Sequence, residues 1–287
     1  MYPAGEAGVS CRILELPGGE RVRCAAAGPP TGVPIVLVHG WGASLYGYRQ
    51  VLPVLAADGC RAVAVDLHGY PIGSPPAPKG SRRHTTGAMT ERLAAILDAL
   101  GLERPILVGH SMAGRLVLDY VFENPERVRG AAVLAPIGIG FLRPGVRSAA
   151  RPILATARRV GPAIVRRSVI RGIVGAVTGR LRRATDRDID EYWAPTQFQS
   201  YLTTVHELLR DFDWRALPPD RLAKIPVPVS ILVGELDPII CAPRPSLLVF
   251  GMAPHRVRVV AGCGHIIADE APAVVVDALR ELVAVSA

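Results

Sequence analysis

A serine stands between small residues in the segment 109–114, which reads Gly-His-Ser-Met-Ala-Gly. The apolar run before Ser111 predicts a strand, and the apolar spacing after it predicts a helix, so Ser111 would lie at a strand-to-helix turn. A G-x-S-x-G-like sequence in that context is typical of a nucleophile elbow, in which a strained backbone presents the hydroxyl. An ordinary glycine-rich turn fits the motif alone, so the interpretation depends on finding a base.

His265 could be that base, and Asp237 could be an acid that orients it. Each of the two follows a different predicted strand, so both would lie near the end of the sheet where Ser111 lies. A hydroxyl is a weak nucleophile at neutral pH until a base removes its proton, and an imidazole held by a carboxylate is suited to this task. Glu235, two positions before Asp237, is the alternative acid, and these residues alone leave the choice open. Cys263 is the alternative nucleophile, but it follows another strand and lacks a helix N-terminus that would favour its thiolate, so we expect it to fill the core.

The segment 39–42, His-Gly-Trp-Gly, follows the first buried strand. A flexible turn there could aim a backbone N–H at a developing oxyanion, together with the N–H of Met112. The remaining histidines have no metal-ligand spacing, so no metal site is predicted and they are expected to be turn or surface imidazoles: His39, His68, His84, His110, His206 and His255.

Strands and helices alternate along the two ends of the chain, which predicts βαβ units in a mostly parallel sheet with helices on both faces. The expected hairpin covers residues 12–26. Buried strands are expected at 34–39, 61–66, 105–108, 131–135, 229–233 and 256–260, and helices at 48–57, 90–100, 112–123 and 272–283.

Between the two ends lies a long segment of helix-like patterns without a buried-strand signal. We therefore expect an α/β core domain of residues 1–136 and 223–287, with residues 137–222 inserted as a helical cap over the carboxyl ends of the strands. The cap holds seven of the fifteen Phe, Trp and Tyr residues of the chain, and Trp193, Phe198 and Tyr201 are the candidates for lining a substrate pocket. Packing between cap and core would use the same side chains.

Six blocks in a fixed order resemble the α/β-hydrolase family of serine hydrolases: residues 39–42, 66–69, 109–112, 124–128, 234–237 and 264–265. The resemblance implies Ser111 as nucleophile, His265 as base, Asp237 as its orienting acid, Trp41 and Met112 as the oxyanion hole, and no required metal or cofactor. A serine rather than an aspartate at the elbow argues against dehalogenase and epoxide hydrolase chemistry. Two departures are Ala113, where the family has a second glycine, and a loop after Asp66 that is one residue longer.

The composition fits a globular chain of 287 residues, with 49% hydrophobic and 20% charged residues. Five cysteines without a repeated spacing, and no apparent signal peptide or membrane span, favour a reducing, cytoplasmic location. The net charge of +8 comes almost entirely from arginine, and the segment from Arg143 to Arg183 has eleven arginines and no acidic residue. The arginines lack an aromatic stacking platform, so nucleic-acid binding is not expected. They indicate either a solvated face or a docking surface for an acidic carrier protein or an anionic surface.

The expected function is hydrolysis of a carboxylic ester, lactone or thioester with a mainly apolar small-molecule substrate, through an acyl-enzyme on Ser111. The same three side chains could serve an acyltransferase or a carbon–carbon bond hydrolase. A non-catalytic ligand-binding protein is a third hypothesis, against which the complete set of three argues. The sequence does not indicate an oligomeric state.

Overall fold

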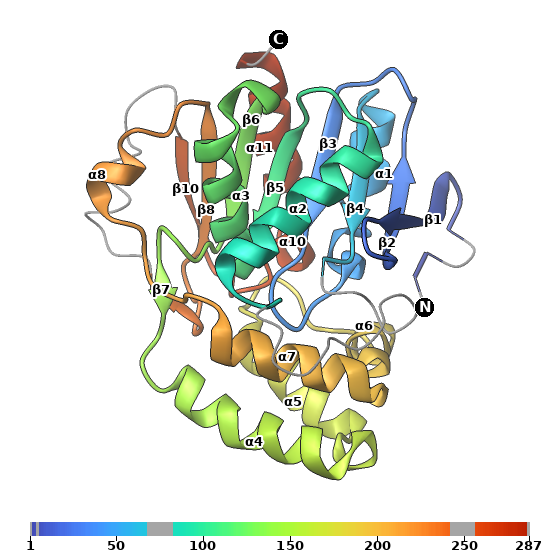
Figure 1. Ribbon diagram of the computed structural model, residues 1–287, viewed down its shortest axis with the longest axis vertical. Coiled ribbons are helices and arrows are strands. Elements are labelled where there is room, and N and C mark those ends of the chain that lie inside the picture. The colour runs from blue at the N-terminus through green and yellow to red at the C-terminus, as the bar shows by residue number, and fades with distance from the viewer. Residues whose placement is uncertain (1, 4–5, 68–82, 242–255, 286–287) are drawn as a thin grey trace.

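An eight-stranded sheet forms the centre of the molecule in the computed structural model, which describes residues 2–3, 6–67, 83–241 and 256–285 (Figure 1). Its strand order is β1-β2-β4-β3-β5-β6-β8-β10, and all pairs are parallel except β1 with β2 and β2 with β4. The strands are β1 (Val9–Leu16), β2 (Glu20–Ala27), β3 (Pro34–Val38), β4 (Arg61–Val65), β5 (Ile106–His110), β6 (Gly130–Leu134), β8 (Val229–Gly234) and β10 (Arg256–Val260).

Continuous apolar runs form the inner strands because both faces of the sheet are covered. In β3, Ile35 and Leu37 belong to one hydrophobic core, whereas Val36 and Val38 belong to the other. Successive side chains of a strand point to opposite faces, so a strand buried on both sides cannot alternate apolar with polar residues. Helices α2 (Thr86–Leu100) and α3 (Met112–Glu123) cover one face, and α1 (Leu52–Ala57), α10 (Ile267–Glu270) and α11 (Pro272–Val285) cover the other.

The predicted fold class is confirmed, and most expected elements differ from the observed ones by a few residues at their ends. The predicted helix over 48–57 is instead a 3₁₀ turn, η1 (Leu45–Tyr48), followed by the short helix α1. Pro53 at the start of α1 explains the break, since proline is favoured in the first turn of a helix but cannot continue one. Helix α2 begins four residues earlier than predicted because the Thr85 side chain accepts a hydrogen bond from the N–H of Ala88.

Residues 137–222, which we call the cap, connect β6 to β8. The segment was expected to lack strands, but it contains the two-residue strand β7 (Phe141–Leu142), which pairs with β9 (Ile240–Cys241) and is too short to give a sequence pattern. Its helical elements are α4 (Val146–Val160), η3 (Pro162–Ile164), α5 (Arg167–Val177), α6 (Asp186–Trp193), η4 (Ala194–Gln197), α7 (Gln199–Asp211) and α8 (Pro219–Leu222).

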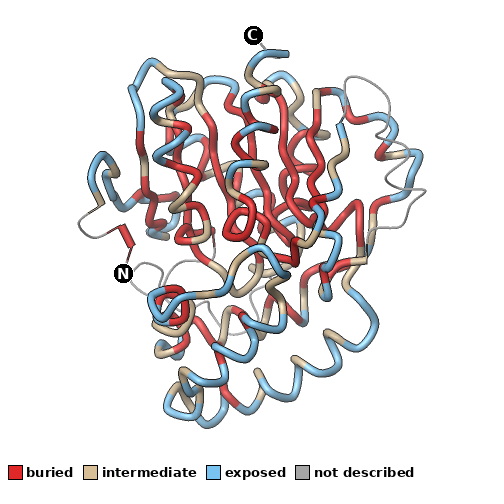
Figure 2. Tube along the Cα trace, turned by 180° about the vertical axis from the view of Figure 1, so that it is seen from behind, coloured by how far each residue is buried: buried red, intermediate tan, exposed pale blue. Residues whose placement is uncertain are grey.

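Helices α4 to α7 form a layer beyond one end of the sheet, and α4 lies farthest from the strands (Figure 1). Hydrogen bonds identify that end as the carboxyl edge. The Trp41 indole N–H, just after β3, donates to the carbonyl of Val205 in α7 at 2.8 Å, and the Tyr201 hydroxyl donates to the carbonyl of Gly42 at 2.8 Å. The inner strands of the sheet are buried and the outermost cap helix is largely exposed (Figure 2). The cap therefore lies over the edge where ligands bind in open α/β sheets.

Candidate active site

Ser111 lies between β5 and α3 with an unusual backbone conformation, φ 53° and ψ −114°. Such a conformation costs a non-glycine residue about 1–3 kcal/mol, so the surrounding contacts must impose it. The Ser111 N–H donates to the carbonyl of Leu134 at 2.8 Å, and the Ser111 carbonyl accepts from Gly114 and Ile137, each at 3.0 Å. The turn is thus held by the first turn of α3 and by the carboxyl end of β6 with the residues that follow it.

Glycines surround this turn because there is no room for larger side chains. A Cβ at Gly109 would lie 2.5 Å from the carbonyl oxygen of Ala113, and one at Gly114 would lie 2.5 Å from the Cβ of Pro136. Ala113, the departure from the family pattern, is fully buried within the core cluster. The turn therefore has room for a methyl group at 113 but for none at 109 or 114.

The imidazole of His265 lies against Ser111. Its Nε2 is 3.1 Å from the Ser111 Oγ, which is within hydrogen-bond range for removal of the hydroxyl proton. On the other side of the ring, Nδ1 lies 2.8 Å from Oδ2 of Asp237. Residues from three separate loops, after β5, β8 and β10, thus form one hydrogen-bonded chain.

Asp237 is 7% exposed and uses both of its carboxylate oxygens. Oδ2 accepts from His265, while Oδ1 accepts from the backbone N–H groups of Ile239 at 2.8 Å and Ile240 at 3.0 Å. Burial by itself raises the pKa of this carboxyl, but His265 and the two N–H groups outweigh burial and hold the pKa of Asp237 below its ordinary value. Asp237 therefore stays ionised beside the imidazole.

The two rival residues have other surroundings. Glu235 is exposed, and its Oε2 accepts from the Gly262 N–H at 2.7 Å rather than from an imidazole. Cys263 is fully buried, and burial raises the pKa of its thiol to about 12, with a further contribution from Glu270. A thiol in that environment is not ionised at neutral pH and is a poor nucleophile.

The cap and Glu270 together hold the loop that carries His265. The His265 N–H donates to the carbonyl of Val177 at 2.8 Å, and the Arg180 N–H donates to the carbonyl of Gly262 at 2.7 Å. The Glu270 carboxylate accepts from the N–H of Gly264 at 3.0 Å and from the N–H of Gly179 at 2.7 Å. Sequence reasoning missed this support, because three of these four contacts join segments about 80 to 90 residues apart.

Two further histidines, His39 and His110, lie at the site, and both are buried. His39 lies in a turn, as expected, whereas His110 belongs to β5 and is neither a turn nor a surface residue. His110 packs on His265 with ring centroids 4.9 Å apart, and its Nε2 lies 2.8 Å from the carbonyl oxygen of His265. Burial lowers the pKa of His110 to about 3, so it is neutral at physiological pH. The ring nitrogens of His39 lie 2.8 Å from the Gly40 carbonyl and 3.0 Å from the Leu67 N–H, so this imidazole braces the turn after β3.

Met112 follows Ser111 in the chain, and Trp41 follows Gly40, which passes close to Ser111; the oxyanion hole at Trp41 and Met112 stays a prediction. Met112 is the first residue of α3, and the first N–H groups of a helix have no partner within it. Gly40, beside Trp41, approaches so closely that a Cβ there would lie 2.9 Å from the Ser111 Cβ. The Trp41 indole is fixed by its bond to Val205 and by edge-to-face packing on Trp214, with centroids 5.9 Å apart.

An apolar cavity of about 600 Å³ is lined by Trp41 and Gly42 of the core and by residues of the cap. Its walls are mostly aliphatic side chains of α4, α5 and α7, among them Leu154, Ile170 and Leu202. Tyr201 lines it, as does Tyr192, which was not predicted. A chamber of this size and polarity suits an apolar ligand.

The other two predicted pocket residues lie away from the cavity. The Trp193 indole N–H donates to the carbonyl of Val165 at 2.8 Å, and its ring packs in a small cluster around Ile170 and Ile189. Phe198 is 40% exposed and does not line the cavity. Both aromatic residues therefore contribute to the cap itself rather than to the cavity wall.

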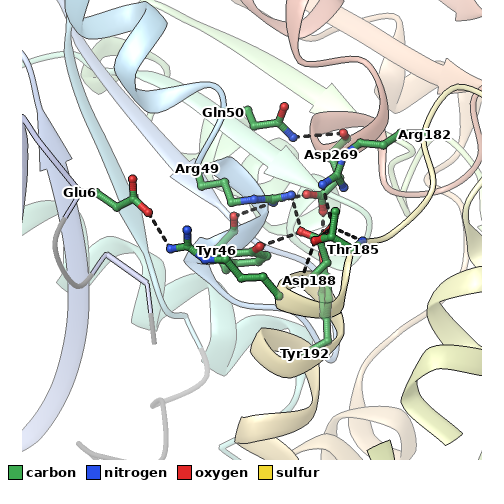
Figure 3. A network of polar contacts seen from close by, with 10 residues as sticks. Glu6, Tyr46, Arg49, Gln50, Arg182, Thr185, Asp188, Tyr192 and Asp269 are labelled. Atoms are coloured by element: carbon green, nitrogen blue, oxygen red, sulfur yellow. Dashed lines mark hydrogen bonds and ion pairs between the residues drawn. The ribbon is translucent and has the colours of Figure 1, made fainter. Parts of the chain in front are cut away.

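A buried polar network fastens α6 of the cap to the core (Figure 3). Arg49 pairs with Asp188 of the cap at 2.6 Å and also with Asp269 of α10. Asp188 further accepts from Tyr46 at 2.7 Å, and Asp269 accepts from Tyr192 at 2.7 Å. Since α10 follows directly after His265, this network sets the position of the cap relative to the candidate base.

The longer loop after Asp66 lies outside the described residues, as do His68 and His255. Within the described part of the chain, no group of three or more His, Cys, Asp and Glu side chains could hold a metal ion. No helix there is long and apolar enough to cross a membrane.

Residues 35–278 match the model of the alpha/beta hydrolase family. The chain belongs to this family. The predicted family is thereby confirmed, and the match of this alpha/beta hydrolase runs from β3 into α11, across the cap.

Among curated relatives, this alpha/beta hydrolase is 25% identical to epoxide hydrolase A of Mycobacterium tuberculosis, covering 92% of this chain and 94% of the relative. It is 34% identical over 123 residues to the dihydrolipoyllysine-residue acetyltransferase component of the acetoin cleaving system of Pseudomonas putida, and 26% identical to bifunctional epoxide hydrolase 2 of Sus scrofa. The alignments span 32% and 48% of the lengths of these two relatives.

Solved structures with the same fold include a 2-hydroxy-6-oxo-6-phenylhexa-2,4-dienoate hydrolase from Rhodococcus, with a TM-score of 0.77, 22% identity, and coverage of 96% of this chain and 99% of that one. A carboxylesterase from Bacillus subtilis has a TM-score of 0.72 and 18% identity, with coverage of 96% and 91%. At these identities the likeness concerns the fold of this alpha/beta hydrolase.

Proposed function

We propose that the protein is a serine-dependent hydrolase of carboxylic esters, lactones or thioesters with an apolar acyl part. The observation that carries the proposal is the hydrogen-bonded chain from Ser111 through His265 to Asp237, in a member of the alpha/beta hydrolase family. Several similar proteins have hydrolase names, among them a carboxylesterase, which agrees with this reaction class.

In the proposed reaction, the Ser111 Oγ attacks the carbonyl carbon while His265 takes the hydroxyl proton. The carbonyl oxygen becomes an oxyanion and accepts hydrogen bonds from the N–H groups of Trp41 and Met112. The C–O or C–S bond to the leaving group then breaks, and His265 returns its proton to the departing oxygen or sulfur. An acyl group remains esterified to Ser111.

Water completes the cycle by the same steps in reverse. His265 takes a proton from a water molecule, whose oxygen attacks the acyl carbon, and the bond to the Ser111 Oγ breaks as that oxygen regains the proton. Asp237 holds the imidazole in the tautomer that leaves Nε2 free to accept the proton. The cavity of about 600 Å³ would hold the apolar acyl part, because Trp41, whose N–H is proposed to bind the oxyanion, is also one of the residues that line the cavity.

The nucleophile can be tested with a fluorophosphonate probe followed by mass mapping of the adduct. We expect one labelled residue, Ser111, and no labelling of the Ser111→Ala variant. Labelling at another residue, or full activity of that variant, would refute the assignment.

The reaction class can be tested with a panel of short and long acyl esters, lactones and acyl thioesters, each assayed with and without an added alcohol acceptor. Hydrolysis that depends on Ser111 supports the proposal. A product that forms only with the acceptor would indicate an acyltransferase. Turnover of none of the panel would contradict the proposed substrate class.

A further inference from the structure

The corner between α4 and α5 exposes large aliphatic side chains to solvent. Ile153 is 63% exposed, Val160 62%, Ile173 53%, Val169 46% and Ile164 42%. Single exposed apolar residues are ordinary, but five around one helix corner form an apolar patch of the kind that marks an interaction site. We call this patch, together with Arg159 and Arg166, the α4–α5 face.

Helical spacing places these residues together. Val160 follows Ile153 by seven residues, so both lie on one side of α4, and Arg166, Val169 and Ile173 are spaced by three and four residues on one side of α5. Four of the five aliphatic residues also line the cavity: Ile153, Ile164, Val169 and Ile173. Because these four side chains are exposed to solvent and also form part of the cavity wall, the cavity opens to solvent through this face.

Positive charge accompanies the apolar patch. Residues 137–222 contain fifteen arginines and eight carboxylate residues, so the cap carries a net charge of +7 out of the +8 of the chain. Arg159 and Arg166 are exposed at the two ends of the turn between α4 and α5, and no carboxylate in the described ranges pairs with either. By contrast, Arg167 and Arg171, on the opposite side of α5, pair with Asp186 of α6.

We propose that the α4–α5 face docks on an anionic lipid surface and that the cavity opens into that surface. Amphipathic helices that combine exposed aliphatic residues with arginines bind at the boundary between headgroups and acyl chains, with the guanidinium groups at the phosphates. The outermost position of α4 leaves this face free to approach a plane (Figure 1).

The other occupants fit the face less well. A second copy of this chain would bring arginines against arginines across a symmetric contact. An acidic protein would satisfy the charge, but it would not account for an apolar chamber that opens in the middle of the face. A lipid surface satisfies both features, since it offers anionic headgroups together with apolar chains that fit the chamber.

The charge part of the proposal is tested by co-sedimentation with vesicles of phosphatidylcholine alone and with added phosphatidylglycerol. We expect binding to require the anionic lipid and to weaken in 0.5 M salt, about an order of magnitude by charge screening. The double variant Arg159→Gln/Arg166→Gln should bind at least about tenfold more weakly. A matched control, Arg104→Gln/Arg256→Gln, removes two exposed arginines at the amino edge of the sheet and should bind like the wild type.

The apolar part is tested by Val160→Ser, a residue on the face that does not line the cavity. Binding should fall roughly three- to tenfold. Val285→Ser, at the exposed end of α11, is the matched control and should have no effect. Equal binding to neutral and anionic vesicles, or no difference between the face variants and their controls, would overturn the proposal.

An acidic protein partner is distinguished with soluble polyglutamate as the probe. Binding to polyglutamate that is lost in the double variant, without binding to vesicles, would overturn the lipid proposal in favour of a protein ligand. All binding measurements are repeated on the Ser111→Ala protein. Docking should be unchanged there, so failure of the proposed hydrolase activity and failure of docking are separate results.

Discussion

Replacing Asp237 by asparagine removes one charge without changing the shape of the side chain, and the structure indicates how the amide would orient. Oδ1 of Asp237 accepts two backbone N–H groups, from Ile239 and Ile240. In Asp237→Asn the amide oxygen would keep that place, because turning the NH₂ group toward two N–H donors would lose two buried hydrogen bonds, at about 1–3 kcal/mol each. The NH₂ group would therefore face Nδ1 of His265.

An NH₂ group at that position donates to Nδ1 and forces the ring proton onto Nε2, the nitrogen that must accept the proton of Ser111. Restoring the productive tautomer would require the unfavourable amide orientation, which costs about 2–6 kcal/mol for two lost hydrogen bonds. At 1.36 kcal/mol per tenfold, that cost corresponds to roughly 30-fold to 10⁴-fold in rate. Loss of the negative charge beside the imidazolium adds to it, so kcat should fall by about 10⁴-fold.

The assay is steady-state hydrolysis of the best ester from the panel by Asp237→Asn, with Glu235→Gln as the matched control. The Gln amide oxygen can still accept from Gly262, so the control should retain nearly full activity. Thermal unfolding should show similar Tm values for both variants, since the backbone hydrogen bonds at residue 237 are kept. A nearly silent Asp237→Asn together with an inactive Glu235→Gln would refute the reasoning.

Three further outcomes follow from the structure. Burial raises the pKa of Asp188, but its many hydrogen bonds outweigh burial and lower that pKa to about 2, against the usual 3.8. The ionised carboxylate should therefore add about 2 kcal/mol to the free energy of unfolding above about pH 5, and this contribution is lost as the pH falls toward 2. Urea unfolding of the wild type and of Asp188→Asn at pH 7 and pH 3 should show a difference in unfolding free energy that is smaller at pH 3. Ala157→Phe should fill part of the cavity and raise the KM of long acyl esters relative to short ones by about tenfold or more. Phe198→Ala, which does not change the cavity wall, should leave the preference for acyl chain length unchanged. A changed preference in Phe198→Ala with none in Ala157→Phe would contradict the assigned pocket. Glu270→Gln should lower kcat by about tenfold with little change in KM, because a single amide oxygen would have to accept the hydrogen bonds that two carboxylate oxygens now accept from Gly264 and Gly179. An unchanged kcat would show that the loop of His265 keeps its position without this carboxylate.

Local sequence patterns predicted the core because each strand and helix there has its own apolar signal. The run of β3 and the spacing in α3 follow from burial on both faces of the sheet. The turn at Ser111 was predicted for the same local reason, since small residues must flank a backbone forced to positive φ. Asp237 and Glu235 both follow β8, and only their observed hydrogen bonds show that Asp237 faces His265.

The cap was less predictable because tertiary contacts set the rotation of its helices. Residue type identifies Trp193 and Phe198 as aromatic, but no local pattern indicates whether their rings face a cavity, a neighbouring helix or solvent. The support of His265 by Val177, Gly179 and Glu270 was equally hidden, since backbone hydrogen bonds between distant segments depend little on side-chain type.

The hydrogen bonds between the segment 177–180 and the loop of His265 have a consequence for cap exchange between relatives. A chimera that replaced residues 137–222 as a block would remove the backbone contacts that position the loop of His265. It would also remove Asp188, the cap partner of Arg49 in the buried polar network. Helices α4 and α5 can be grafted up to residue 176, because they line the chamber and make none of these contacts. The residues that can be exchanged to alter substrate selectivity therefore end within the cap, at the last turn of α5. The rest of the cap has to come from the same protein as the core.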